Sequence, residues 1–238
     1  MKNVAIIGSS GYVGSELVKA FSENSKYDII TLNRQDPIDK LKSADIIIYT
    51  ANPAKRFKAE NNPIIDFEET VEKFARFFNY SINKRIILIS SLSCRTQLNT
   101  NYGRNRRACE LLATSKKNNL VMRLGPLFGG NRTLDTLHDI IAGKQVFVSE
   151  DTLYAYTDIE WAAHSIIKYV EHGSGIIELG PKNSVRLGDI RDFFNSKTKF
   201  TGFNDTQIPI DSNFNIDANL VFDYAIEEKN RIHQWLVK

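Results

Sequence analysis

Three glycines, Gly8, Gly11 and Gly14, follow the first apolar run of the chain in a GxxGxxG spacing. Each has its own use at a strand-to-helix turn: the first permits a tight turn, the second lets a ligand approach the backbone, and the third lets the helix pack closely on the strand. This arrangement predicts that the N–H groups at the helix N-terminus bind a pyrophosphate. The alternative is an ordinary turn that contains glycine.

The elements that must position this turn lie on either side of it. Residues 4–7 are aliphatic without alternation, which predicts a buried strand. From Tyr12 onward, Val13, Leu17, Val18 and Phe21 fall on one face of a helix. The turn residues expected to bind the cofactor are Gly8, Ser10, Gly11, Tyr12, Val13 and Gly14.

The rest of the chain alternates strand and helix patterns, which predicts an α/β fold with a doubly wound parallel sheet. The expected strands are 3–8, 28–33, 45–50, 85–90, 119–124 and 175–179. The expected helices are 12–24, 67–80, 103–117, 132–142, 158–171, 187–196 and 220–236. Residues 200–219 are polar and receive no assignment.

Composition narrows the class of protein. The chain has 238 residues, 42% of them hydrophobic, enough for one cored domain. Its 31 basic and 28 acidic residues give a net charge of +3, which predicts neither a nucleic-acid nor a membrane partner. Cys94 and Cys109 do not form a disulfide framework, and no signal peptide or spanning segment is apparent, so we expect a cytoplasmic protein. The His and Cys spacings predict no metal site.

Taken together, the motifs resemble the extended short-chain dehydrogenases/reductases, the NAD(P)-dependent epimerase/dehydratase family. The resemblance runs in order across about residues 2–195, and its glycine and tyrosine blocks are the specific parts. It implies a Rossmann-type sheet. The matching segments are Gly8–Gly14, Ala44–Ala51, Arg85–Ser91, Tyr102-Gly103-Arg104-Asn105-Arg106, Met122–Pro126, Tyr156–Asp158 and Ile176–Gly180.

The resemblance implies a catalytic set of Ser91, Tyr102 and Arg106. Tyr102 matches the family's acid/base, and Ser91 matches the serine that holds the substrate oxygen, with Ser90 and Ser93 as alternates. Arg106 stands where the family has a lysine that lowers the tyrosine pKa and bonds the nicotinamide ribose. Arginine keeps the charge but cannot release a proton. The alternative is a surface tyrosine with a solvated arginine.

The end of the second expected strand bears on the choice of nicotinamide cofactor. NAD-binding members have an acidic residue there, whereas this chain has Asn33 and Arg34. Arg34 would attract a 2′-phosphate, so we expect NADP(H) to be favoured over NAD(H). Alternatively, Arg34 is solvated and Asp36 contacts the ribose. Ala51 matches the family's cofactor-facing alanine.

The family resemblance also implies a reaction class. Leu92 and Ser93 replace the acidic pair of the family's 4,6-dehydratases, so we expect epimerisation or carbonyl reduction, with a nucleotide sugar as substrate. One alternative is an NADP(H)-binding sensor or scaffold with little turnover, and another is an atypical reductase of a non-sugar carbonyl. The family pairs helices into a four-helix bundle, which implies a homodimer. We expect a single domain over 1–238, in which about 145–238 forms a small substrate-binding lobe.

Overall fold

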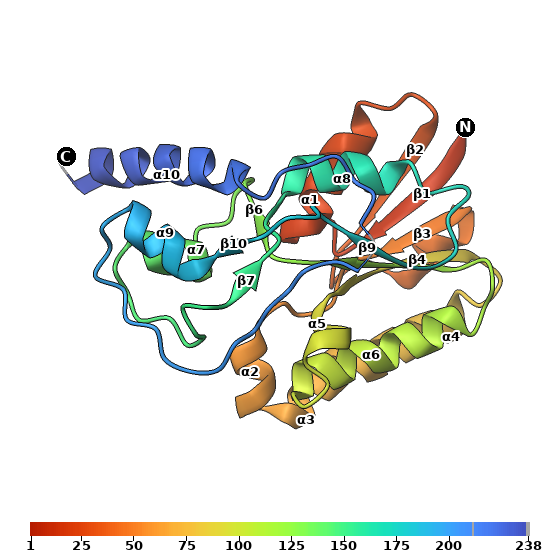
Figure 1. Cartoon of the computed structure of the whole chain (residues 1–238). Helices are drawn as coiled ribbons and strands as arrows, with labels where there is room; N and C mark the ends of the chain where they lie inside the picture. Colours follow the sequence, from red (N-terminus) through yellow and green to blue (C-terminus); the bar gives the residue numbers. More distant parts are fainter. Residues whose placement is uncertain (211, 237–238) are drawn as a thin grey trace. The chain divides into compact units, whose positions relative to one another are not determined.

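The computed structural model of the chain, drawn in Figure 1, describes residues 1–210 and 212–236. It contains two compact units. Unit 1 comprises Met1–Leu124 and Glu160–Glu178, and unit 2 comprises Gly125–Ile159 and the chain from Leu179 onward. The single domain with a small substrate-binding lobe stays a prediction.

Unit 1 is built on the predicted sheet, in the strand order β2-β1-β3-β4-β5-β9. Neighbouring strands from β2 to β5 are parallel, as expected for aliphatic runs buried on both faces. The doubly wound α/β expectation is therefore confirmed. The strands are β1 (Lys2–Ile7), β2 (Tyr27–Leu32), β3 (Ile46–Tyr49), β4 (Arg85–Ser91), β5 (Leu120–Leu124) and β9 (Gly175–Leu179).

Helices cover the two faces of this sheet (Figure 1). On one face, Lys19 of α1 pairs with Glu160 of α8, so these two helices lie side by side. On the other face, aromatic residues of α4 and small residues of α6 pack on β3, β4 and β5 in one core. The helices are α1 (Tyr12–Ser22), α2 (Arg56–Asn61), α3 (Pro63–Phe67), α4 (Lys73–Tyr80), α5 (Ser93–Thr96), α6 (Asn101–Thr114) and α8 (Ile159–Ile167).

One helix of unit 1 differs from the sequence expectation, and one connection is as short as the sequence predicts. The helix expected at 67–80 begins earlier: α3, the π-helical turn η2 (Glu68–Glu72) and α4 follow one another with helical backbone at their junctions. Pro63 is at the first turn of α3, where its missing N–H costs nothing. Between β2 and β3 the chain forms only a short 3₁₀ helix, η1 (Ile38–Ser43).

Unit 2 has its own apolar core, in which Phe128, Leu137, Ile190 and Val221 are buried. Two small strand pairs support it: β6 (Leu127–Phe128) with β8 (Thr157–Asp158), and β7 (Leu153–Tyr154) with β10 (Val185–Arg186). Its helices are α7 (Thr136–Ile141), α9 (Leu187–Phe193) and α10 (Leu220–Leu236).

The helices of unit 2 are close to the expected ones, although α7 is shorter than predicted. It begins at Thr136 because the Asp135 side chain caps it by accepting from the His138 N–H. The unassigned stretch after residue 199 contacts the unit through isolated bridges, Val146 with Phe200 and Tyr154 with Gln207.

Two kinds of feature are absent from the described part of the chain. None of its helices is both long and apolar enough to cross a bilayer. Within the same residues, no group of three or more His, Cys, Asp or Glu side chains has an arrangement that could hold a metal ion.

Candidate functional site

The glycine turn between β1 and α1 is packed too tightly for side chains at two of its positions. Gly8 has φ +81°, and a Cβ there would lie 2.9 Å from the Cα of Ala51. A Cβ on Gly14 would lie 2.1 Å from the carbonyl oxygen of Gly8. The turn therefore touches the chain that follows β3, and α1 lies directly against it.

Two side chains hold the glycine turn in place. The Asn33 Oδ1 atom accepts hydrogen bonds from the Ser10 N–H, at 3.0 Å, and from the Ser10 hydroxyl, at 2.8 Å. The Thr50 hydroxyl donates to the carbonyl of Ile7 at 2.7 Å. Thus residues at the ends of β2 and β3 both fix the turn after β1.

This turn lies where the strand order reverses, because β2 is on one side of β1 and β3 on the other. Ligands of open α/β sheets bind at such switch points. Gly11 is the N-cap of α1 and has no side chain with which to cap the first N–H groups. Tyr12 and Val13 are the first residues of the helix, so the positive end of the helix dipole faces the turn.

The end of β2 shows how the predicted adenosine-binding residues are held. Arg34 is exposed, and its Nη2 lies 2.9 Å from Oε2 of Glu69. A hydrogen bond from Lys73 and the charges of Lys73 and Arg34 lower the pKa of Glu69, so it pairs as a carboxylate. Asp36 accepts from the Asn33 N–H at 2.8 Å. A preference for NADP(H) stays a prediction.

Ser91 and Ser90, adjacent at the end of β4, have different surroundings. The Ser91 hydroxyl contacts the Ser93 hydroxyl and accepts from the Ser93 N–H, both at 3.3 Å. Ser90 is buried and donates to Glu110 at 2.8 Å, in the core beneath α6. Alternation along a strand turns consecutive side chains to opposite faces. Of the two, Ser91 is the better placed for a ligand.

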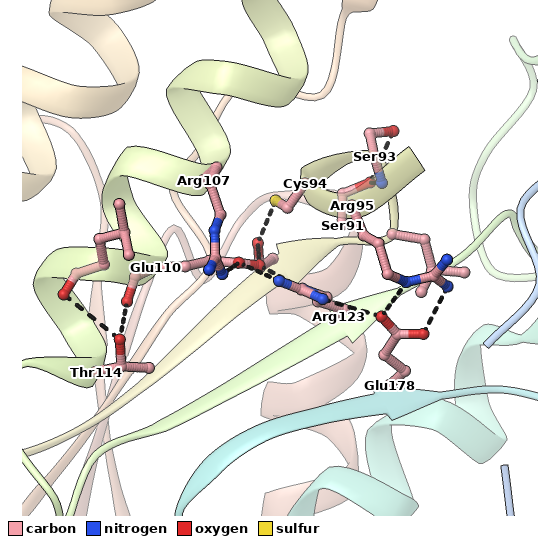
Figure 2. Close-up of polar contacts among 12 residues, drawn as sticks. Ser91, Ser93, Cys94, Arg95, Arg107, Glu110, Thr114, Arg123 and Glu178 are labelled. Atoms are coloured by element: carbon pink, nitrogen blue, oxygen red, sulfur yellow. Dashed lines mark hydrogen bonds and ion pairs between the residues drawn. The ribbon is translucent and has the colours of Figure 1, made fainter. Parts of the chain in front are cut away.

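A buried ion-pair network lies behind these serines (Figure 2). Arg123 of β5 donates to both oxygens of Glu110, at 2.8 and 2.6 Å, and to Glu178 at 3.0 Å. Arg95 of α5 makes a two-pronged contact with Glu178, with both distances 2.8 Å. The network connects β5, β9, α5 and α6, and thereby fixes the segment that follows Ser91.

In this network Glu110 is ionised, whereas the neighbouring Cys94 is neutral. Burial raises the pKa of Glu110, but hydrogen bonds from Arg123 and Ser90 and the Arg123 charge outweigh it, so the pKa lies below its ordinary value. Burial raises the pKa of the Cys94 thiol to about 12. Cys94 is therefore a protonated packing residue rather than a nucleophile.

Tyr102 and Arg106 lie one turn apart on α6 and are both buried. The Arg106 Cζ lies 4.8 Å from the centroid of the Tyr102 ring. One NH₂ group of Arg106 donates to the carbonyl of Pro53. The alternative of a surface tyrosine beside a solvated arginine does not match this burial.

The start of α6 is brought close to the segment after Ser91. A Cβ on Gly103 would lie 2.0 Å from the carbonyl oxygen of Gln97 and 2.8 Å from that of Ser93. This close approach requires glycine. The turn that contains Tyr102 therefore packs directly on the chain leaving β4.

Sequence reasoning missed two contributors to this site. Glu60, from the unexpected helix α2, accepts from the Asn101 N–H at 2.7 Å and so caps α6. Asn52 has both polar atoms of its amide buried, with no hydrogen-bond partner in the described residues, and Arg106 Nε is in the same condition. The only available signal for Asn52 was its place directly after Ala51.

Comparison with known proteins gives a fold but no sequence relative. No protein-family model and no curated protein sequence matches the chain. Solved structures do match, with a TM-score of 0.78 for a UDP-glucuronic acid 4-epimerase from Bacillus cereus in complex with UDP-glucuronic acid and NAD. That match has 13% identity and covers 97% of this chain and 99% of the other.

Two further solved structures show the range of chemistry on this fold. A UDP-N-acetylglucosamine 4-epimerase from Methanobrevibacter ruminantium matches with a TM-score of 0.75 and 16% identity over 98% of this chain and 99% of the other. A dTDP-4-dehydrorhamnose reductase from Clostridium acetobutylicum matches with a TM-score of 0.69 and 16% identity over 85% and 84%. The chain therefore has the fold of the extended short-chain dehydrogenases and epimerases, as its motifs predict.

Proposed function

We propose that the chain is an NAD(P)-dependent epimerase or reductase that acts on a nucleotide sugar by hydride transfer. The observation that carries this proposal is the glycine turn at the β1/β3 switch point, which leaves no room for a side chain at Gly8, against Ala51, or at Gly14. The residues present fit a dinucleotide, because Asn52 and Arg106 also have buried polar atoms that lack partners in the described chain. The similar epimerases were solved with UDP-sugars, and one with NAD.

The proposed catalytic set serves the transfer of one proton between the substrate hydroxyl and Tyr102. When bound, the nicotinamide would supply a reversible hydride acceptor. Tyr102 takes the proton from the substrate hydroxyl when that carbon loses its hydride, and returns it when the carbonyl is reduced. Ser91 holds the same oxygen by a hydrogen bond. Arg106 supplies a fixed positive charge against the Tyr102 ring.

The proposal is tested by cofactor titration with the native protein and with Gly11→Asp. An aspartate there would place a negative charge at the expected pyrophosphate position, so we expect NADH and NADPH binding to be lost while the protein stays folded. Ser25→Asp is the matched control, because it adds the same charge at an exposed turn residue after the far end of α1. Undiminished binding in a folded Gly11→Asp protein would refute the proposal.

A second candidate function is a cofactor-binding sensor with little turnover. Arg106 favours it, because the guanidinium is held by the Pro53 carbonyl and cannot release a proton to a relay. Turnover assays with UDP-glucose, UDP-glucuronic acid and UDP-N-acetylglucosamine separate the two functions. Epimerised or reduced product supports the enzyme, whereas tight cofactor binding without product on the panel supports the sensor.

We also propose that the chain forms a homodimer through α3 and α6. Ile64, Ile65 and Phe67 of α3 and Leu111 of α6 are large apolar side chains exposed in unit 1. An exposed apolar group of this kind is typical of an interface. Sedimentation of the native protein and of the double variant Ile64→Asp/Leu111→Asp tests it. We expect a dimer and a monomer respectively, and a monomeric native protein would reject the proposal.

A further inference from the structure

We infer that Asn52 is a cofactor-binding residue, whose amide takes the hydroxyls of the ribose on the nicotinamide side of the dinucleotide. The inference rests on the proposed function and assigns a residue within the same site. Both Oδ1 and Nδ2 of Asn52 are buried, and neither reaches a hydrogen-bond partner in residues 1–210 and 212–236.

Such an amide is expensive for a ligand-free protein. A buried polar group without a partner loses its hydration without regaining a hydrogen bond, so native structures keep few of them. Asn52 is also not part of a helix or strand whose packing would require it. A ligand hydroxyl that hydrogen-bonds to the Asn52 amide would remove this free-energy cost.

The neighbours of Asn52 place it between the two halves of the site. Ala51, on one side, lies against Gly8 of the glycine turn. Pro53, on the other, accepts the hydrogen bond from Arg106, which lies over the Tyr102 ring. The chain at Asn52 therefore runs from the expected pyrophosphate position to the expected acid/base.

Strand order points to the part of the cofactor that passes here. The glycine turn follows β1, Ser91 ends β4, and β3 lies between these two strands. Neighbouring strands are about 4.8 Å apart, so a ligand reaching from the turn to Ser91 crosses the end of β3. The group attached directly to the pyrophosphate on that side is a ribose.

The chemistry of the unpartnered atoms complements a ribose diol. Asn52 offers one acceptor and two donor N–H groups, and Arg106 Nε offers a further buried donor without a partner among the described residues. Two vicinal hydroxyls can donate to Oδ1 and accept from Nδ2. The Arg106 guanidinium is already held by the Pro53 carbonyl, so it does not bind the ribose hydroxyls alone. Asn52 supplies the remaining contact to these hydroxyls.

The test compares Asn52→Leu with native protein in three calorimetric titrations, with NADH, NADPH and ADP. ADP retains the adenosine and the pyrophosphate but lacks the second ribose. We expect Asn52→Leu to weaken the better-bound dinucleotide about tenfold or more and to leave ADP within about twofold. Asn62→Leu, at an exposed asparagine in the same connection, is the control and should change neither.

Thermal unfolding of the ligand-free proteins separates a binding role from a structural one. Because the amide makes no hydrogen bond to the described chain, Asn52→Leu should melt at the native temperature or above it. Native dinucleotide affinity in Asn52→Leu, or equal losses for ADP and the dinucleotide, would overturn the inference alone. A native protein that binds neither NADH nor NADPH would instead overturn the proposed function, and the inference with it.

Discussion

The Arg106 guanidinium lies over the Tyr102 ring, with its Cζ 4.8 Å from the ring centroid, and donates to the carbonyl of Pro53. Its planar fork makes both contacts at once, which the compact ammonium of a lysine cannot do in the same way. The charge is thereby tied to the loop that follows β3. The pair provides two predictions that separate an acid/base role from a binding role.

Tyr102→Phe removes the hydroxyl and keeps the ring on which Arg106 stacks. We expect turnover to fall by about 100-fold or more, because the proton of the substrate hydroxyl has no acceptor. Cofactor affinity should stay within about twofold. Steady-state rates on one accepted nucleotide sugar, combined with a cofactor titration, check this. Full activity in the variant would remove Tyr102 from the mechanism.

Arg106→Lys replaces a group that holds its protons with one that can exchange them with water. We expect turnover to rise above that of the native protein. Arg104→Lys makes the same change on an exposed residue of α6 and should leave the rate unchanged. A lower rate for Arg106→Lys than for native protein would show that the contact with Pro53 matters more than proton exchange.

Arg34 and Glu69 offer a test of cofactor preference. Arg34→Ala should weaken NADPH binding by about 1.5–3 kcal/mol, the range for a hydrogen bond to a charged group, and leave NADH binding almost unchanged. Glu69→Gln removes the carboxylate that Arg34 now contacts, so it should strengthen NADPH. Parallel titrations of both cofactors decide the matter. Equal losses for NADH and NADPH in Arg34→Ala would contradict a preference for NADP(H).

Glu110→Gln tests the buried ion-pair network. The substitution leaves Arg123 with one carboxylate partner instead of two, so we expect unfolding free energy at pH 7 to fall by about 3 kcal/mol. Urea denaturation measures it. Glu171→Gln, which breaks an exposed pair with Lys2, is the control and should change stability little.

The same variant gives a pH dependence of known sign. The folded-state pKa of Glu110 lies below its ordinary value of 4.5, so its contribution is complete above pH 4.5 and is lost as the pH falls through the folded pKa. The stability difference between native protein and Glu110→Gln should therefore narrow below pH 4.5. A constant difference from pH 7 to pH 3 would show that the charge of Glu110 is not what stabilises the network.

Much of the sheet could be predicted because its signals are local. Aliphatic runs such as those preceding Gly8 and Ser91 can only be buried strands in a chain with this alternation. The glycine turn was also predictable, since three glycines at that spacing have few other uses. The earlier start of α3 had a signal as well: Pro63 at a first helical turn.

The missed features depend on contacts between distant residues. The carbonyl that Arg106 bonds is 53 residues away, and the carboxylate that caps Asn101 is 41 residues away. Each strand in the two strand pairs of unit 2 is only two residues long, which is too short to show an alternating pattern in the sequence. The isolation of Asn52 is visible only when its surroundings are known.

Ser90 and Ser91 are chemically identical, so composition alone cannot decide which of them is buried beneath α6. In the observed pairing of β4 with β5, Ser90 lies opposite Arg123 and Ser91 opposite Leu124. A shift of one residue would exchange the two faces of the strand and separate Ser90 from Glu110. The buried charges thus fix the register of β4 against β5. Because the register decides which serine is buried, the same ion pairs also keep Ser91 accessible.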